Sequence, residues 1–489
     1  MALKKTFTQE WKNWITTNLN NGQNKDGVFK ILMDKGYDVD AIANEMNYFP
    51  GIPLGQLENP FDAAAAQAKK AQSASTSTSI NPLENLGVQV DPSQLFIPNS
   101  RKLPSSKLEI YTLDNFLNKQ ECEKIIDLIS TKLRPSGLSS FEADNSFRTS
   151  KTCDLGTLDD PFMEDIDNRI CQIIGIDSSS SEVVQGQYYE IGQQFKAHTD
   201  YFELNEIVKY GGQMGQRTYT MMVYLNDVQE GGETAFVNIN EEFKPKQGMA
   251  LIWNSLNPDG SPNIDSMHFA KPVIKGHKAV ITKWFRSHSS LPSFVPMWTK
   301  EKNELVPNYT EVGFKIATMP ESLFTKINDF YRSHNAKKQD EYVPGDFIFT
   351  SDKKGKSSVL IELTESLRTD IHDCMKPMLE QWCGKKLAPT YVYGIREYQD
   401  KAVLKSHRDR IDTHVISVII NVDQDVNEDW PLVIDDNYYR THHVILKPGE
   451  VVFYESARLK HGRPIAFNGK SFANIFCHFV PTDYASIQA

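Results

Sequence analysis

The pattern of hydrophobic and polar positions changes in character at about residue 107. Before that point, "FTQEWKNWITTNL" and "DGVFKILMDKGY" space their apolar residues as amphipathic helices do. Gly36 is placed to end the second helix, and Asp38 is placed to cap a third over "VDAIANEM". The pattern predicts a small helical module at residues 1–50, which can either bind a protein partner or pack against the rest of the chain.

Residues 51–105 are predicted to form a linker that is partly disordered. Its central stretch, "DAAAAQAKKAQSASTSTSINP", has an Ala-rich half that can be transiently helical. The Ser/Thr-rich half offers little to bury, as is typical of linkers.

The next segment combines helices with many short strands. "KLEIYTLDNFLNKQECEKIIDLIS" predicts a strand and then a helix that begins near Asn118. Between about 183 and 287, short apolar stretches alternate with Gly, Pro and Asn turns, which favours a β-sandwich or barrel. Because the helices precede the strands, the fold class is α+β rather than alternating α/β.

The same order of elements then recurs. The helical patterns "ESLFTKINDFYRSH" and "TESLRTDIHDCMKPMLEQW" precede the strand patterns "YVYGIREY", "HVISVIINV" and "HHVILKPGEVVFYES". The sequence therefore predicts two domains of one architecture, at residues 106–290 and 291–489.

Composition narrows the classes of partner. A formal net charge of -10 argues against nucleic acid as the main partner, because phosphate binding needs clustered Lys and Arg. The six cysteines form no CxxC pair, which favours reduced thiols, and the two N-terminal lysines precede no apolar signal-peptide segment. No apolar run approaches the ~18 residues of a membrane span. We expect a cytoplasmic protein without a membrane partner.

Candidate metal ligands lie in the stretch "FKAHTDYF". His198 and Asp200 are two residues apart, so on an extended segment they face the same side. His268, in a later strand, is the candidate third ligand. Two His and one carboxylate leave positions open on a metal and suit non-haem Fe(II) oxygen chemistry. Zinc hydrolysis also fits three ligands and an open position.

A second set of residues repeats this spacing. His407 and Asp409 are again two residues apart, and His461 follows in a later strand. A tyrosine lies nine residues before the first His of each set, at Tyr189 and Tyr398. An HxD pair by itself occurs by chance, but the repeat of the whole pattern makes two metal centres the better interpretation.

The quoted motifs resemble a known family. "YYEIGQQFKAHTD", "QRTYTMMVYLNDVQEGGETAF", "KPKQGMALIW" and "HFAKPVIKGHKAVITKWF" are similar to the catalytic domain of prolyl 4-hydroxylases, which are Fe(II)/2-oxoglutarate dioxygenases. Residues of about 390–482 resemble a more divergent branch of the same superfamily. The resemblance implies two double-stranded β-helix (jelly-roll, cupin-like) domains with flanking helices.

The resemblance also assigns roles to individual residues. It implies two iron centres, a pair of residues that bind 2-oxoglutarate at each, and two residues that line the catalytic groove. The metal ligands would be His198, Asp200, His268, His407, Asp409 and His461; the co-substrate residues Tyr189, Lys278, Tyr398 and Lys470; and the catalytic-groove residues Arg217 and Trp284.

The second copy departs from the first in two ways. It is 52 residues from Asp409 to His461 but 68 from Asp200 to His268, which predicts a shorter loop and a more open second site. Lys470 follows its His by nine residues where Lys278 follows by ten, so Arg463 is a substitute anchor. Six further histidines show no partner pattern and are not predicted to be functional: His277, His288, His334, His372, His414 and His478. His442 and His443 alternate across a predicted strand, so at most one of them faces inward.

The function implied by the resemblance is that of a procollagen-proline 4-dioxygenase-like enzyme. It would hydroxylate an unactivated C–H, of a prolyl residue in a peptide or protein, and release succinate and CO2. Fe(II), 2-oxoglutarate and O2 would be required, with ascorbate as reductant. Three alternatives stay open: the second domain is a structural or substrate-binding copy, the substrate is a free amino acid or other small molecule, or the fold is a non-catalytic binding module.

Overall fold

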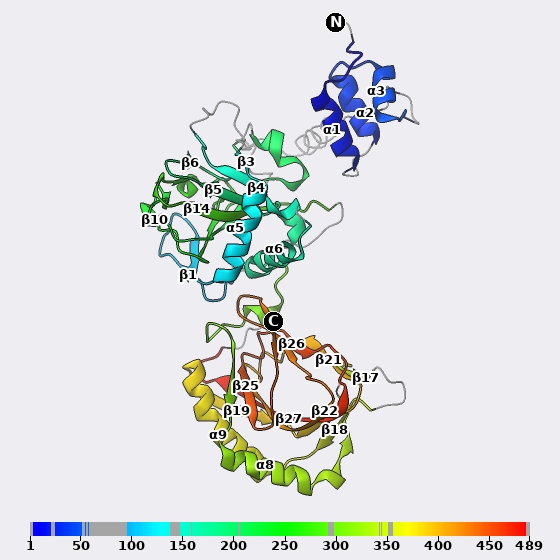
Figure 1. Ribbon diagram of the computed structural model, residues 1–489, viewed down its shortest axis with the longest axis vertical. Helices are drawn as coiled ribbons and strands as arrows, with labels where there is room; N and C mark the ends of the chain where they lie inside the picture. The colour runs from blue at the N-terminus through cyan, green and yellow to red at the C-terminus, as the bar shows by residue number, and fades with distance from the viewer. Residues whose placement is uncertain are drawn as a thin grey trace, which may run out of the picture. The chain divides into compact units, whose positions relative to one another are not determined.

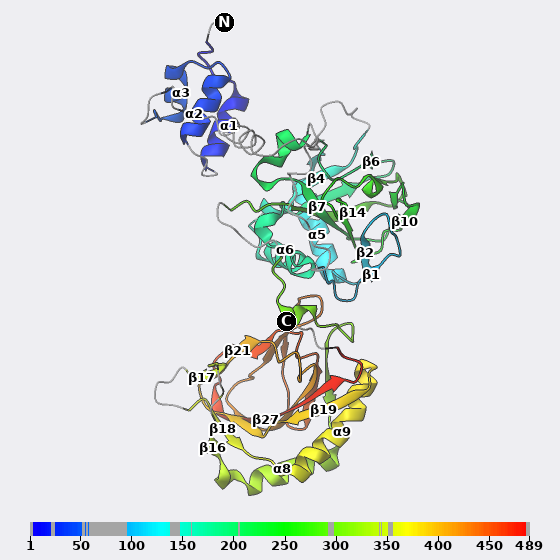
Figure 2. The same cartoon turned by 180° about the vertical axis from the view of Figure 1, so that it is seen from behind.

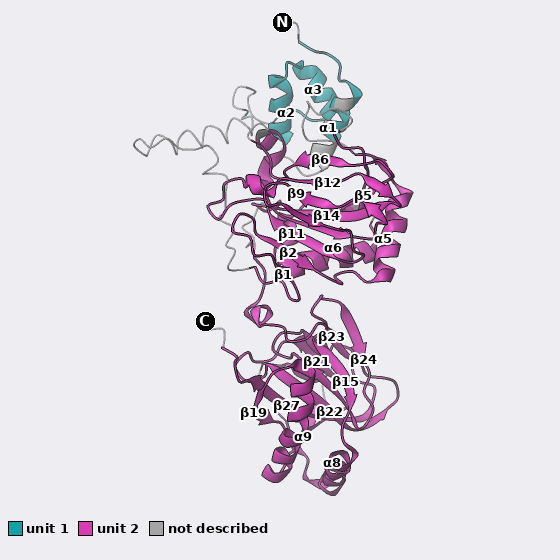
Figure 3. Ribbon diagram, turned by 90° about the vertical axis from the view of Figure 1, so that its left-hand side faces the viewer, with its two compact units in different colours: residues 1–81 teal, residues 82–489 magenta. Residues whose placement is uncertain are grey.

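The computed structural model describes residues 3–20, 25–50, 54, 57, 95–136, 147–157, 159–203, 206–291, 298–341, 343, 345–350 and 356–485. The chain divides into two compact units, residues 1–81 and 82–489 (Figure 3). Most of the predicted linker, residues 58–94, lies outside the described residues. Its predicted end at residue 105 is corrected, because β1 (Arg101–Lys102) pairs with β2 (Ile110–Leu113) in a sheet of the second unit.

The first unit contains the helices α1 (Gln9–Asn20), α2 (Lys25–Asp34) and α3 (Val39–Met46). Val28, Phe29 and Ile42 are buried in its apolar core. The Asp38 carboxylate accepts hydrogen bonds from the backbone N–H groups of Asp40 and Ala41, which confirms the predicted cap of α3.

The second unit begins with a pair of β-sheets. The larger has eight strands in the order β1, β2, β11 (Ala250–Asn254), β7 (Arg217–Tyr224), β14 (Lys278–Arg286), β5 (Gln185–Tyr189), β4 (Lys151–Asp154) and β3 (Arg134–Pro135). The smaller has the order β10 (Glu241–Phe243), β9 (Thr234–Phe236), β12 (His268–Ala270) and β6 (Phe195–His198). A short ladder joins β8 (Glu230–Gly231) to β13 (Val273–Lys275).

Apolar residues fill both faces of the larger sheet. Met222 and Trp253 of the larger sheet share a buried cluster with Phe236 and Ala270 of the smaller one, so this core lies between the sheets. Helices α5 (Lys119–Thr131) and α6 (Pro161–Ile174) cover the other face (Figures 1 and 2). Asn118 caps α5, as predicted, through a capping box.

A second pair of sheets follows. The larger has the order β15 (Phe314–Thr318), β25 (Glu450–Tyr454), β22 (Ile416–Val426), β27 (Gly469–Pro481), β20 (Ile395–Tyr398), β18 (Ser358–Ile361) and β16 (Gln339–Asp340), with β19 (Leu387–Val392) also paired to β27. The smaller has the order β17 (Ile348–Thr350), β21 (Ala402–His407), β26 (His461–Arg463), β23 (Leu432–Asp435) and β24 (Thr441–Val444). Helices α8 (Glu321–Ser333) and α9 (Glu365–Cys383) cover the larger sheet (Figure 1).

The two sheet pairs share a strand order. The central run β11-β7-β14-β5 of the first corresponds to β25-β22-β27-β20 of the second, and β9-β12-β6 corresponds to β23-β26-β21. The mixed helix-and-sheet class predicted from the sequence is confirmed. None of the described helices has the length and hydropathy to cross a membrane.

Candidate active site

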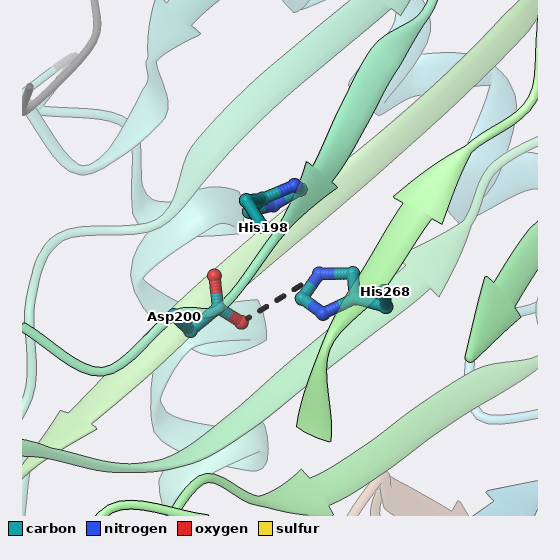
Figure 4. Close-up of side chains that lie close together, drawn as sticks. All are labelled: His198, Asp200 and His268. Atoms are coloured by element: carbon teal, nitrogen blue, oxygen red, sulfur yellow. Dashed lines mark ion pairs between the residues drawn. The ribbon is translucent and has the colours of Figure 1, made fainter. Parts of the chain in front are cut away.

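The first predicted metal triad comes together between β6 and β12. His198, the last residue of β6, lies directly opposite His268, the first residue of β12, and Asp200 follows two residues beyond His198. One ligand atom from each lies within 4.8 Å of the others. Figure 4 shows the three side chains converging, with 4.0 Å between Nε2 of His268 and a carboxylate oxygen of Asp200.

Hydrogen bonds orient each of the three ligands. The His198 Nδ1 atom is 2.7 Å from the carbonyl oxygen of Lys196, and the His268 Nδ1 atom is 2.9 Å from that of Ser266. A carbonyl only accepts, so Nδ1 carries the proton in both rings and Nε2 keeps its lone pair for a metal. The Thr220 hydroxyl donates to Oδ2 of Asp200 at 2.8 Å.

The electrostatics give these ligands the protonation states that a metal requires. Burial, followed by the nearby His268, lowers the pKa of His198 to about 3, so its ring is neutral at pH 7. Burial alone would raise the pKa of Asp200, but His268, His198, Arg217 and the Thr220 hydroxyl together outweigh burial, and the net shift is downward. A neutral imidazole at His198 and an ionised carboxylate at Asp200 fit a divalent cation such as Fe(II).

A cavity of about 40 Å³ adjoins the triad and contains the predicted co-substrate residues Tyr189 and Lys278. Lys278 is 1% exposed, and its ammonium contacts the Thr234 hydroxyl at 3.3 Å. Among the described residues, no carboxylate lies within ion-pair distance of it. Burial lowers the pKa of Lys278 to about 7. The Tyr189 hydroxyl donates to Gln187 at 2.9 Å.

Trp284 and Arg217 lie side by side at this cavity. Trp284 lines it, and the Arg217 guanidinium stacks 4.2 Å from the centre of the Trp284 ring. Two hydrogen bonds of 2.7 Å to Glu182 hold Arg217 in that position, and a weaker contact of 3.5 Å joins it to the backbone oxygen of Asp200. Arg217 is not itself among the lining residues, so it acts on the cavity through Trp284.

The second predicted triad has the same construction. His407 ends β21 directly opposite His461, and with Asp409 they also bring one ligand atom each within 4.8 Å of the others. Their Nδ1 atoms lie 2.8 Å from the carbonyl oxygen of Lys405 and 2.9 Å from that of Leu459, which again leaves Nε2 for a metal.

The cavity beside the second triad is much larger, about 570 Å³, as the shorter loop predicted. Two histidines that the sequence does not predict to be functional, His414 and His478, line this cavity and stack with ring centroids 3.7 Å apart. The correspondence between the two sheet pairs could have pointed to these histidines. Ser417 corresponds to Thr220, and His414 precedes Ser417 by three residues, as Arg217 precedes Thr220.

The prediction for Lys470 is corrected by the structure. Its side chain, at the start of β27, is 84% exposed, lies 3.7 Å from Asp425, and is not among the residues that line the second cavity. The β27–β22 ladder shifts register between Asp425 and Val426, so counting residues from His461 does not give the facing position. Tyr398, predicted to bind the same co-substrate, is fully buried and pairs with Phe472.

Arg463, the substitute anchor, is buried at 1% exposure. One terminal nitrogen donates to the backbone oxygen of Trp430, and the other has no hydrogen-bond partner among the described residues. Burial lowers the pKa of Arg463 to about 10, and Tyr398 opposes that shift.

The match to a family model falls within the first sheet pair. The model of the 2OG-Fe(II) oxygenase superfamily matches residues 184–286. Probable prolyl 4-hydroxylase 8 of Arabidopsis thaliana is 34% identical over 201 residues, covering 36% of this chain and 68% of the relative. Probable prolyl 4-hydroxylase 3 of the same plant is 34% identical over 197 residues, with coverages of 36% and 68%.

A solved structure is also similar. It is a viral collagen prolyl hydroxylase from Paramecium bursaria Chlorella virus-1, with 24% identity, a TM-score of 0.31, and coverage of 36% of this chain and 96% of that one. On the sequence relationship to the plant proteins, the chain belongs to the prolyl 4-hydroxylase family of 2OG-Fe(II) oxygenases and is a 2-oxoglutarate-dependent dioxygenase.

Proposed function

We propose that the first centre hydroxylates a prolyl residue in a peptide or protein. The observation that carries this is Lys278, a buried cation without a carboxylate partner, in the cavity beside the triad. An uncompensated buried charge costs several kcal/mol, roughly, so its presence calls for an anionic ligand. The plant relatives are named prolyl 4-hydroxylases, which supports the choice of substrate.

The family implies Fe(II) and 2-oxoglutarate with O2. Together they supply the oxidising chemistry: one oxygen atom of O2 enters the substrate C–H bond as hydroxyl, and the other enters succinate as 2-oxoglutarate loses CO2. His198, Asp200 and His268 would hold the metal. Their hydrogen bonds to backbone carbonyls and to Thr220 fix the direction of each ligand atom.

Other residues of the chain orient the co-substrate and substrate. Lys278 acts as a point charge for the distal carboxylate of 2-oxoglutarate, and Tyr189 lies beside it in the same cavity. Trp284, supported by the Arg217 guanidinium, forms a flat wall against which a proline ring can pack. The cavity walls of Phe195, Met222 and Ala270 exclude water from the reacting atoms.

We propose that residues 291–489 hold a second metal centre on a second double-stranded β-helix. The matching strand order supports it, and so does the matching arrangement of His407, Asp409 and His461. The competing proposal is that this half is a structural or substrate-binding copy. One observation favours this competing proposal: the position that corresponds to Lys278 holds the uncharged Phe472.

The test is succinate formation from 2-oxoglutarate with Fe(II) and ascorbate under air, with proline-containing peptides as substrates. The full-length protein is compared with His198→Ala and His407→Ala. Loss of peptide-dependent succinate in His198→Ala alone assigns prolyl hydroxylation to the first centre. Partial loss in each variant assigns turnover to both. Activity on free amino acids but not on peptides would overturn the peptide substrate.

Ascorbate dependence is measured in the same assay. We expect ascorbate to sustain turnover over many cycles and to leave the first cycle unchanged. A protein that binds Fe(II) and 2-oxoglutarate but forms no succinate with any of these substrates would favour the non-catalytic alternative.

A further inference from the structure

The strand registers make His478 the counterpart of Trp284. In the first centre Trp284 of β14 lies opposite Thr220 of β7. In the second centre His478 of β27 lies opposite Ser417 of β22. These strands occupy matching places in the two sheets, and each of the two side chains lines the cavity beside its triad.

A neighbouring strand gives the same correspondence. Trp253 of β11 and Tyr454 of β25 lie on the other side of β7 and β22, in matching register positions. Each of these rings has its centre 4.9 Å from the ring centre of the distal histidine of its triad, His268 or His461. Two strand pairs in each sheet therefore agree on which residues correspond.

The first centre offers a hydrogen-bond donor at this position. The Trp284 indole N–H is buried at the cavity and has no hydrogen-bond partner among the described residues. An indole nitrogen donates and does not accept. A prolyl residue brings a carbonyl oxygen but no backbone N–H, because its amide is tertiary. A donor in the site therefore suits the proposed prolyl substrate.

Hydrogen bonds determine which nitrogen of His478 carries the proton. The Ser456 hydroxyl donates its one hydrogen to the backbone oxygen of His414 at 2.7 Å. Ser417 lies 2.6 Å from Ser456, so the Ser417 hydroxyl donates to Ser456. Ser417 then has only a lone pair for Nδ1 of His478, which is 2.7 Å away. The proton of His478 is therefore on Nδ1, and its Nε2 holds a lone pair.

The Nε2 atom of His478 is available to a ligand. Burial, followed by the nearby His414, lowers the pKa of His478 to about 3, so the ring is neutral at pH 7. His478 is 5% exposed and lines the second cavity, and none of the described residues forms a hydrogen bond with its Nε2. The second centre thus offers an acceptor where the first offers a donor.

The rest of the second cavity favours a neutral ligand with an apolar body. Asp409 is the one carboxylate among the described residues that line it, and three arginines line it as well, which disfavours an ammonium group. Phe347 and Tyr391 are 41% and 47% exposed and give a peptide two rings to pack against. A volume of about 570 Å³ admits a residue together with its neighbours.

We infer that the second centre takes a peptide residue that presents a neutral hydrogen-bond donor, an O–H or an N–H, to Nε2 of His478. The inference rests on the proposed metal centre at His407, Asp409 and His461. An unmodified prolyl residue has neither donor and leaves the buried acceptor unpaired, so it binds this cavity less well. The two centres of the chain therefore select different residues.

The proposed product of the first centre belongs to the class that the second centre selects. Hydroxylation turns a prolyl residue, which has no donor, into one that carries an O–H. A residue with a secondary amide N–H belongs to the same class by another route. The shared requirement is a donor opposite His478, and matched peptides distinguish the two sources.

The test measures peptide binding to the full-length chain without turnover. Asp200→Ala removes a metal ligand of the first centre, and the protein is loaded with Fe(II) and 2-oxoglutarate under anaerobic conditions. Four peptides of one sequence differ only at the central residue: proline, 4-hydroxyproline, N-methylalanine or alanine. The first two differ by an O–H and the last two by an N–H. Calorimetry gives each Kd, and metal analysis counts the bound Fe(II).

We expect the peptide with the donor to bind about 3- to 10-fold more tightly than its partner in at least one of the two pairs. His478→Phe keeps a ring to stack on His414 and removes the acceptor, so the ratio should fall to about 1. His478→Gln places an amide oxygen near the same point and should recover part of the preference. His334→Phe is the control, because His334 is not among the residues that line the cavity, and it should leave the ratio unchanged.

The outcomes separate this inference from the proposed metal centre. One Fe(II) per chain with equal Kd values within both pairs, or with no binding of any peptide, would overturn the donor requirement and leave the metal centre standing. A donor preference that needs His478 but occurs without bound Fe(II) would overturn the metal centre and support the donor requirement. Equal losses in His478→Phe and His334→Phe would overturn the role of His478.

A second variant covers a misfolded His478→Phe, which its loss of Fe(II) would reveal. Ser417→Ala removes the group that holds the proton of His478 on Nδ1. The proton can then move to Nε2, so the preference for a donor should weaken while the Fe(II) count stays the same. An unchanged preference in Ser417→Ala would overturn the assignment of Nε2 as the acceptor.

Discussion

Lys278 lies directly opposite Tyr189 in the sheet, and its ammonium is 5.3 Å from the centre of the Tyr189 ring. The pair and the metal triad line the same cavity. A dicarboxylate that reaches a metal with one end therefore meets Lys278 with the other. This geometry makes Lys278 the most informative residue of the first centre.

Lys278→Met should weaken 2-oxoglutarate binding and stabilise the free protein. The substitution removes the charge that pairs with the ligand, so the Kd should rise about 30-fold or more. It also removes an uncompensated buried charge, so thermal unfolding of the ligand-free protein at pH 6 should shift to higher temperature. Lys283→Met, which breaks an ion pair with Asp167 at 2.6 Å, is the control and should lower that temperature.

Binding of 2-oxoglutarate to the first centre should depend on pH through the same lysine. Burial lowers the pKa of Lys278 to about 7, so above pH 7 the free protein must take up a proton to pair with the carboxylate. The affinity should be highest below pH 7 and fall above it by up to about tenfold per pH unit. Calorimetry at pH 8 in two buffers of different ionisation enthalpy measures the proton uptake.

The same pKa shift has a consequence for stability. Because the folded pKa of Lys278 lies below that of the unfolded chain, the unfolded state binds more protons between about pH 7 and 10.5. The contribution of Lys278 to the free energy of unfolding therefore increases as the pH rises through that window. Below pH 7 the lysine is charged in both states, and the full destabilisation from burying its charge is present. Equal pH profiles for the original protein and Lys278→Met would contradict both effects.

The sequence predicted the ligands of both triads but placed Lys470 wrongly, and the reason is geometric. Two residues apart on an extended segment, His198 and Asp200 face one side, so their pairing is visible in the sequence although β6 ends at His198. Residues further along depend on register. The shift in the β27–β22 ladder moves Lys470 to the surface, and no count of residues from His461 shows it.

The stacked pair His414 and His478 was missed for a related reason. The two residues are far apart in sequence, and each by itself looks like an ordinary core histidine. Only the register of β22 with β27 places His478 opposite Ser417, as Trp284 lies opposite Thr220. Each triad thus has a stacked pair beside it: Arg217 on Trp284 in the first centre, and His414 on His478 in the second.

Metal stoichiometry tests the two triads separately. The full-length protein should bind two Fe(II), or two Co(II) as a stable probe, per chain. Asp200→Ala and Asp409→Ala should each bind one, because two imidazoles alone hold a divalent cation weakly without the carboxylate. Asp412→Ala, an exposed carboxylate just beyond Asp409, should retain both metals. One metal in the unchanged protein would contradict the second centre.

Thr220 should matter for metal affinity without touching the metal. Its hydroxyl donates to Asp200 at 2.8 Å, which fixes the carboxylate and stabilises its ionised form. Thr220→Val keeps the shape and removes that bond, so the affinity for Fe(II) should fall about 10- to 100-fold. Thr218→Val is the matched control for the change in packing, because the buried Thr218 hydroxyl has no hydrogen-bond partner among the described residues. An equal effect of both variants would show a packing defect instead.

Trp284 should act on the peptide and not on the co-substrate. Its indole N–H is buried at the cavity and has no hydrogen-bond partner among the described residues, while its ring stacks on Arg217. Trp284→Phe retains a ring for the guanidinium and removes the donor, whereas Trp284→Leu removes both. If the N–H binds the peptide backbone, Trp284→Phe should raise the peptide KM about 3- to 10-fold with the Kd for 2-oxoglutarate unchanged. If only the stacked wall matters, Trp284→Phe should match the original protein and Trp284→Leu alone should lose affinity. A change in the 2-oxoglutarate Kd in Trp284→Phe would show that Trp284 contacts the co-substrate, and it would contradict both the hydrogen-bond and the stacked-wall interpretation.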